Sequence, residues 1–328
     1  MQKKYPIHQS PLYKLQSKAK LSELLSYRGE DISSLPAWKR KHAKHLNKLS
    51  VRDLKELTRQ PLGARFKIRE DDGRVIEDPR PLLKLIHRRI KNLICRIETP
   101  VYLHSAVKKR SYVTNAHSHL GNRCVGCLDI RKFYPSTSFE QINGFFRRDM
   151  ECSPDVAYLL TCLIACDGHL PTGSPLSPIL SFHVHRRMFE ELYQYCMSAQ
   201  LTFTCYVDDL IVSGDSLTGK QLFEMRKIIF KHGLFAHPNK TKLFVGTRPK
   251  TVTGVVLYKD KMNLPNVRHK KVHDLLADMD KTPELIKTNV FLNKLQGAIC
   301  EARQVDRVAG DRFLFSLNKN IPTILGSN

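Results

Sequence analysis

Two adjacent carboxylates, Asp208 and Asp209, stand between two short apolar runs, 201–205 and 210–212. Both runs are rich in aromatic and β-branched residues, which is typical of strands, so the acids are expected at the turn of a β-hairpin covering 202–213. Two ionised carboxylates side by side repel one another unless a hard cation lies between them. Mg²⁺ suits such a place because it takes few protein carboxylates and completes its shell with water and phosphate oxygens. An isolated Asp-Asp pair would more often be an ordinary acidic turn.

A third acid, Asp129, ends another apolar run, residues 124–130. Phosphoryl transfer with two magnesium ions needs at least two carboxylates that converge from different strands, with room for a triphosphate. Asp129 is therefore expected to lie beside Asp208 and Asp209.

The composition indicates a globular protein that binds a polyanion. The chain has 328 residues, of which 41% are hydrophobic, enough for a sizeable core. Its 54 Lys and Arg against 31 Asp and Glu give a formal charge of +23, too large for an enzyme of small neutral metabolites. Nucleic acid is the usual partner, because released counterions supply most of the non-specific affinity. A membrane surface is the competing polyanion, but no basic amphipathic helix with a Trp or Phe face supports it.

The cysteines and the N-terminus favour a cytoplasmic location without membrane contact. Nine Cys is an odd number, and several lie in apolar segments, as reduced thiols do. Cys124 and Cys127 have metal-ligand spacing, but zinc needs about four ligands and no second pair follows, so both are interpreted as core residues. No apolar run approaches the roughly 20 residues that span a bilayer, and no signal-peptide core follows the N-terminus.

Hydrophobic patterns predict the elements that position the acids. Alternation around a turn at 71–73 predicts a hairpin over 64–76, and one apolar stripe predicts a helix over 82–97. Further helices are expected at 138–149, 154–166, 176–198, 217–232 and from about 268 to 318, and further strands at 124–130, 202–213, 242–246 and 252–258. The first 60 residues are basic and partly helical, densest in Lys, Arg and His over 37–48, which on a polyanion binder favours contact with phosphates.

The motifs, taken in order, resemble those of the reverse transcriptases, and within them the bacterial retron-type enzymes, from about residue 66 to 254. Residues 128–136 look like the first metal-binding motif of the palm domain. The resemblance implies that Asp129 binds both ions and that the carbonyl of Ile130 is a minor ligand. Tyr134 holds the place of the aromatic gate whose ring excludes a 2′-hydroxyl; taken alone, it would be a core residue.

The Tyr-Val-Asp-Asp sequence at 206–209 matches the signature hairpin of the family. By that likeness Asp208 is a metal ligand and Asp209 a supporting acid. Lys240, in a stretch that resembles the next motif, is expected to protonate the leaving pyrophosphate; otherwise it is a surface lysine.

Residues 170–178 resemble the Gly/Pro-rich turn that lies against the template and the incoming nucleotide. The resemblance implies nucleotide contacts from Thr172 and Gly173, although the family commonly has Gln where this chain has the shorter Thr172. The spacing of Arg74 from Ile76 and Pro79 resembles that of the fingers residue that grips the triphosphate. Candidates for this grip are Arg74, Lys67 and Arg69.

Two short elements resemble retron enzymes in particular: an Asn-Ala-x-x-His motif at 115–119 and a Val-Thr-Gly motif at 252–254. The resemblance implies a cognate structured non-coding RNA as partner, deoxynucleoside triphosphates as substrates, a branched RNA–DNA product (msDNA), a role in anti-phage defence, and an effector or toxin protein encoded nearby. Residues expected to bind RNA are Asn115, His119, Val252, Thr253, Gly254, Arg268, Lys270 and Lys271.

The fold expected is α+β, a right-hand polymerase with an antiparallel palm sheet and a helical thumb. The domains expected are a basic N-terminal extension (1–60), fingers (61–125), palm (126–260, with a fingers insertion near 136–175) and thumb (261–328). The activity expected is RNA-directed DNA synthesis with two Mg²⁺ ions. The alternatives are a defence-associated reverse transcriptase outside the retrons, with different priming, and a non-catalytic RNA-binding scaffold.

Overall fold

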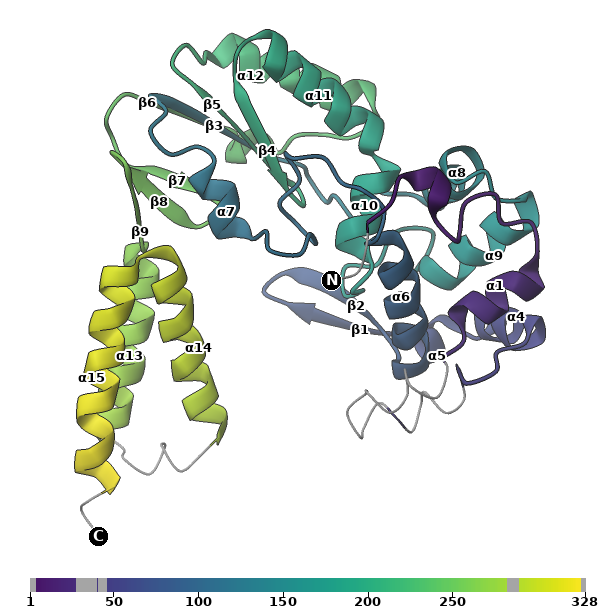
Figure 1. The fold of residues 1–328 in the computed structure, drawn as a ribbon, viewed down its shortest axis with the longest axis horizontal. Helices are drawn as coiled ribbons and strands as arrows, with labels where there is room; N and C mark the ends of the chain where they lie inside the picture. Colours follow the sequence, from purple (N-terminus) through teal and green to yellow (C-terminus); the bar gives the residue numbers. More distant parts are fainter. Residues whose placement is uncertain (1–3, 28–39, 41–45, 282–288, 326–328) are drawn as a thin grey trace.

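The structure, a computed structural model, describes residues 4–27, 40, 46–281 and 289–325, so the basic segment expected at 37–48 lies mostly outside the described residues (Figure 1). The first half of the chain forms η1 (Ile7–Gln9), α1 (Lys18–Leu25), α4 (Val51–Arg59), α5 (Leu62–Arg65), β1 (Phe66–Asp71), β2 (Arg74–Pro79), α6 (Pro81–Ile94), α7 (Tyr112–His117), β3 (Cys124–Asp129), α8 (Phe139–Gly144), η3 (Phe145–Asp149) and α9 (Pro154–Ile164). The second half forms α10 (Ser177–Val184), α11 (Arg186–Ser198), β4 (Thr202–Tyr206), β5 (Asp209–Gly214), α12 (Gly219–Lys231), η4 (Pro238–Lys240), β6 (Lys242–Val245), β7 (Lys250–Val252), β8 (Val255–Tyr258), β9 (Lys261–Asn263), α13 (Asn266–Lys281), α14 (Asn289–Val305) and α15 (Arg307–Leu325).

An antiparallel sheet in the order β4-β5-β3-β6 lies next to α11 and α12 in the upper part of the view in Figure 1. β3 pairs with β5 over its whole length, from Cys124 opposite Gly214 to Asp129 opposite Asp209. A Cβ atom on Gly126 of β3 would lie 2.6 Å from the side chain of Leu222, so this glycine lets α12 pack directly on the strand. The fold is thus a mixture of helices and antiparallel sheets, as expected.

Both faces of this sheet are buried, each in a different hydrophobic core. Successive side chains of a strand point to opposite faces. In β5, Leu210 and Val212 belong to a first core, which also contains side chains of α11, α12 and the N-terminal helices. Ile211 belongs to a second core with Val125 of β3 and side chains of α7, the sheet β7-β8-β9 and the C-terminal helices. Burial on both faces explains why β5 is apolar without alternation.

The hairpin of β1 and β2 projects beside α5 and α6, as expected from the alternation at 64–76 (Figure 1). The C-terminal helices α13, α14 and α15 stand apart from the rest of the molecule, next to the sheet β7-β8-β9 (Figure 1). At Gly310 a Cβ atom would lie 2.3 Å from Cα of Arg303, so the absence of a side chain allows α15 to approach α14 closely. Among the described residues, no helix has the length and apolarity needed to cross a membrane.

Several predicted elements differ from those observed. The helix expected over 176–198 is broken at His185, whose buried ring bonds the hydroxyl of Thr137 at 2.9 Å and packs 5.3 Å from the ring of Phe133. The strand expected over 252–258 turns at Thr253 and Gly254, which both have positive φ, and becomes the hairpin of β7 and β8. The helix expected over 138–149 ends in a π-helical turn, η3. Helix α7 and strand β9 were not predicted.

Candidate active site

The Tyr-Val-Asp-Asp sequence forms the tight hairpin that the apolar runs predict. Tyr206 ends β4 and Asp209 begins β5, so Val207 and Asp208 make the turn. Val207 has a φ of 60°, which is strained for a β-branched residue. Its backbone N–H donates to the hydroxyl of Ser105 at 3.0 Å, and Ser105 is buried. This contact, which the sequence does not indicate, holds the hairpin tip in the strained conformation.

Asp129 lies directly opposite Asp209 in the antiparallel register, as expected. The backbone carbonyl of Asp208 accepts a hydrogen bond from Ile130 at 3.0 Å, and the carbonyl of Asp129 accepts one from His237 at 2.7 Å. These backbone bonds fix the ends of β3 and of the hairpin relative to each other. The structure therefore gathers Asp129, Asp208 and Asp209 at one end of the sheet.

The electrostatics of this end favour a cation. Burial raises the pKa of Asp209 to about 7, and the charges of Asp208 and Asp129 also raise it. Burial raises the pKa of Asp208 as well, whereas the charges of Lys240 and Arg74 act in the opposite direction. Lys240 reaches the site from η4, and its Nζ donates to Oδ2 of Asp129 at 2.9 Å. Positive charge placed between the acids would relieve their repulsion, and a hard cation matches carboxylate oxygens.

Tyr134 lies beside the acids. Its ring is partly buried and stacks with Phe133 at a centroid distance of 6.0 Å. Burial raises the pKa of the Tyr134 hydroxyl, and the charge of Asp208 raises it further. The phenol is therefore protonated at neutral pH and remains uncharged next to the carboxylates.

The candidate phosphate-binding side chains share one face of the β1–β2 hairpin. The register pairs Lys67 with Asp78, Arg69 with Ile76 and Asp71 with Arg74, and directly paired residues lie on the same face. Arg69 also forms an ion pair with Asp71 at 3.0 Å, and all of these hairpin cations are exposed. The charge of Arg74 lowers the pKa of Asp208, against the raising effect of burial, so Arg74 is within electrostatic range of the acids.

The chain matches the family described as reverse transcriptase (RNA-dependent DNA polymerase) over residues 67–257. This match covers more than half of the sequence. The chain belongs to the reverse transcriptase family. It is 29% identical to the retron Se72 reverse transcriptase of Salmonella heidelberg, over 69% of this chain and 58% of that protein. It is 24% identical to the retron Ec86 reverse transcriptase of Escherichia coli, over 61% of this chain and 63% of that protein.

This reverse transcriptase chain thus aligns with about six tenths of the length of those two relatives. Their names support the retron-type resemblance of the motifs. Among solved structures, apo telomerase from Candida tropicalis aligns with a TM-score of 0.44 and 13% identity, over 62% of this chain and 55% of that chain.

The two residues expected to bind RNA at the Asn-Ala-x-x-His motif lie inside the reverse transcriptase fold. Asn115 and His119 are 0% and 1% exposed. The His119 ring bonds the hydroxyls of Ser213 and Thr204, both at 2.7 Å, beneath β4 and β5. Direct contact of Asn115 or His119 with RNA does not fit this burial. A motif match carries no information on exposure, so the sequence alone could not show that these two side chains are buried.

The Val-Thr-Gly motif lies at a joint, the contact region between α7, the sheet β7-β8-β9 and the C-terminal helices. Val252 is buried, and the hydroxyl of Thr253 donates to the carbonyl of Tyr112 at 3.0 Å. Gly254 has a φ of 76°, which favours glycine, and a Cβ atom there would lie 2.9 Å from the guanidinium of Arg268 and force that side chain to shift.

Arg268 is itself engaged in this joint, not free for RNA. It donates to the Tyr112 hydroxyl at 3.1 Å and pairs with Glu301 of α14 at 3.1 Å. No local pattern predicts the roles of Tyr112 and Glu301, because Tyr112 is 156 positions from Arg268 and 189 positions from Glu301 in the chain. Lys270 and Lys271 are exposed on α13 and remain available to nucleic acid.

Thr172 and Gly173 do not point freely into the site. The Thr172 hydroxyl donates to the carbonyl of Val75 and accepts from the backbone N–H of Glu77, both in β2. Gly173 donates to the carbonyl of Glu77. The Thr172 hydroxyl therefore makes a contact within the protein where the family commonly has a longer Gln.

Cys124 and Cys127 face opposite sides of β3. The Cys124 thiol contacts the carbonyl of Asp215 at 3.6 Å, and the Cys127 thiol contacts that of Thr251 at 3.7 Å. Residues three apart on a strand point to opposite faces, so the two sulfurs are not aimed at a common ion.

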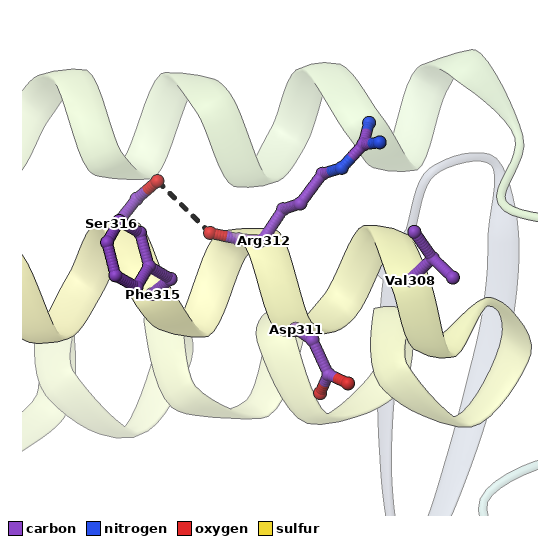
Figure 2. A pocket seen from close by; sticks show the side chains of 5 residues that line it. All are labelled: Val308, Asp311, Arg312, Phe315 and Ser316. Carbon is purple, nitrogen blue, oxygen red and sulfur yellow. Dashed lines mark hydrogen bonds between the residues drawn. The ribbon is translucent and has the colours of Figure 1, made fainter.

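A cavity of about 560 Å³ lies on the surface of α15, away from the acids. Figure 2 shows its lining, which comes from that single helix: Val308, Asp311, Arg312, Phe315 and Ser316. It includes none of the predicted site residues.

Lowering the pH from about 7.5 to about 5 is expected to reduce the free energy of unfolding by about 2 kcal/mol, because of the buried His119. Burial, and to a smaller extent the charge of His104, lowers the pKa of His119 to about 3. The unfolded chain takes up this proton below a pH of about 6.5, whereas the folded protein does not, so stability present above that pH is lost as the pH falls toward 3. Denaturant unfolding at the two pH values measures the difference.

The matched variants are His119→Gln, which removes the buried imidazole, and His117→Gln, which changes an exposed His two residues earlier, at the end of α7. The first should lose about 2 kcal/mol of the pH dependence, and the second should behave like the wild type. An unchanged pH dependence in His119→Gln would show that this residue does not contribute.

Proposed function

We propose that this chain is an RNA-directed DNA polymerase of retron type. The observation that carries the proposal is the convergence of Asp129, Asp208 and Asp209 at one end of the sheet, in a chain of the reverse transcriptase family. Three carboxylates of like charge repel one another when gathered at one place, and a bound cation would relieve that repulsion.

In this proposal the chain forms a right hand. The β1–β2 hairpin and its helices (61–125) are the fingers, residues 126–260 the palm with the insertion near 136–175, and residues 261–328 the thumb. Residues 1–60 form the N-terminal extension. The separate packing of α13, α14 and α15 supports the thumb assignment.

Asp129 and Asp208 would hold two Mg²⁺ ions, with Asp209 in support and the Ile130 carbonyl as a minor ligand. The described residues contain no group of three or more His, Cys, Asp or Glu side chains arranged to hold a metal ion. Mg²⁺ uses one or two protein carboxylates and completes its shell with water and phosphate oxygens, a role that Asp129 and Asp208 would fill. When bound, the ions activate the attacking hydroxyl and neutralise charge on the leaving diphosphate.

The other side chains bind and position the substrate. Arg74, with Lys67 and Arg69, grips the triphosphate from the fingers. Tyr134 places its uncharged ring under the sugar and excludes a 2′-hydroxyl. Lys240, already within hydrogen-bonding distance of Asp129, donates a proton to the leaving diphosphate.

The template is proposed to be a cognate structured non-coding RNA, from which DNA starts at an internal 2′-hydroxyl to give a branched RNA–DNA. The retron names of the relatives and the Asn-Ala-x-x-His and Val-Thr-Gly motifs support this choice. Lys270 and Lys271, which are exposed on α13, would bind RNA phosphates. Anti-phage defence with a nearby effector protein is part of the same proposal; a defence-associated enzyme outside the retrons is the second candidate.

The wild-type protein is expected to extend a DNA primer on an RNA template with deoxynucleoside triphosphates and Mg²⁺. Incorporation of labelled nucleotide measures this activity. With the structured RNA encoded next to its gene, and no primer, it should also give a product joined to RNA through a 2′ linkage, which a debranching enzyme cleaves. Absence of any extension would contradict polymerase function, and extension without the branched product would favour the second candidate.

A further inference from the structure

The turn at Thr172 and Gly173 binds the free edge of β2 as an additional strand would. The Thr172 hydroxyl donates to the carbonyl of Val75 at 2.8 Å and accepts from the backbone N–H of Glu77 at 3.0 Å. Gly173 donates to the carbonyl of Glu77 at 3.1 Å. One hydroxyl and one backbone amide thus satisfy three backbone groups of the fingers strand.

Glu77 completes the attachment with its side chain. It is 6% exposed, and its Oε2 accepts from the backbone N–H of Thr172 at 3.2 Å. Its Oε1 lies 2.8 Å from Nε2 of His169. A carboxylate buried to this extent is costly unless hydrogen-bonded, so these partners fix its position.

The two segments are in direct backbone contact. A Cβ atom on Gly173 would lie 2.7 Å from the Glu77 carbonyl and 2.8 Å from Cα of Asp78. A side chain at position 173 would therefore displace β2 from the turn.

The position of this attachment matters because Arg74 belongs to the same short strand. Arg74 begins β2, three residues before Glu77, and its charge reaches Asp208. Fixing the edge of β2 at Val75 and Glu77 therefore fixes where the guanidinium stands relative to the acids.

We propose that Thr172, Glu77 and His169 form a latch that holds the fingers strand β2 on the palm and thereby sets the affinity for the incoming nucleotide. They are positioning residues: they act through Arg74 and touch neither substrate nor metal. The inference rests on the proposed polymerase function. It also assigns Thr172 a role different from the nucleotide contact implied by the family resemblance.

The test is Thr172→Val, which keeps the shape of the side chain and removes both hydroxyl bonds. The KM for a deoxynucleoside triphosphate should rise about tenfold, while kcat changes less than about threefold, because nucleotide binding is weakened and the acids are untouched. Thr172→Ser restores the hydroxyl and should restore KM. Thr58→Val, at a partly exposed site on α4, is the matched control and should leave KM unchanged.

A double-mutant cycle with Glu77→Gln separates the latch from a direct nucleotide contact. If both residues act through the latch, the double variant should be little worse than the more affected single variant. The latch would be overturned if the two single effects on KM multiplied in the double variant. It would also be overturned if Thr172→Val left KM unaltered.

Hydrogen exchange gives a readout that needs no catalysis. Backbone amides of residues 74–78, above all that of Glu77, should exchange faster in Thr172→Val than in the wild type, since the strand edge is released. Unchanged exchange would overturn the latch even if the wild type were inactive. If the wild type were inactive and exchange were still faster in the variant, the polymerase proposal would be contradicted. The attachment of β2 to the turn at Thr172 and Gly173 would still be supported.

Discussion

The double variant Asp208→Asn, Asp209→Asn is expected to lose RNA-templated primer extension by about 10³-fold or more, because bound metal stabilises the transition state by several kcal/mol. Its fold should persist. Burial raises the pKa of Asp209 to about 7, which means that the ionised pair is unfavourable in the folded protein at neutral pH. Neutral amides remove that cost, so the melting temperature at pH 7 should equal or exceed that of the wild type. Primer extension and thermal unfolding measure the two effects.

Asp215→Asn provides the control, because Asp215 is an exposed acid just beyond the other end of β5. It should retain wild-type extension. Affinity for RNA should also be unchanged in the double variant. Extension at wild-type rate by the folded double variant would rule out the polymerase assignment, and loss of its fold would show that the acids are structural.

Replacing Tyr134 by Ala is expected to reduce discrimination against ribonucleotides by about 100-fold, because a steric contact and not a hydrogen bond excludes the 2′-hydroxyl. The ring is held by its stacking on Phe133 and stands beside Asp208. Competition between deoxy- and ribonucleoside triphosphates gives the ratio of kcat/KM values.

Tyr134→Phe separates the ring from the hydroxyl. It keeps the aromatic face and should preserve discrimination within about threefold, if steric exclusion alone is responsible. Equal loss in both variants would assign the effect to the hydroxyl. Unchanged discrimination in Tyr134→Ala would make Tyr134 a packing residue.

The sequence was sufficient for the parts of the site that follow from strand periodicity. Short apolar runs ended by acids predicted both the Asp208 hairpin and its neighbour Asp129, because antiparallel strands bring their ends together. Helices with one apolar stripe, such as α6, were predicted to within a few residues for the same reason.

Features that depend on long-range contacts could not be predicted. The helix that local propensity would continue through His185 is interrupted there, where the His185 ring bonds Thr137, 48 positions away in the chain. Thr172 bonds to a strand 95 positions away in the chain, and no local pattern indicates that distance. The burial of Asn115 and His119 likewise depends on which segments cover α7, which the spacing of the motif does not specify.

The sheet that carries the acids lies between two hydrophobic cores and contributes side chains to both. Leu210 and Val212 are stabilised from one side, and Ile211 and Val125 from the other. Apolar burial on the two faces contributes separately, so local unfolding of the core around the C-terminal helices would leave β3, β4 and β5 held by the first core. The register that places Asp129 opposite Asp209 would therefore survive such an opening, because both strands keep their contacts with the first core.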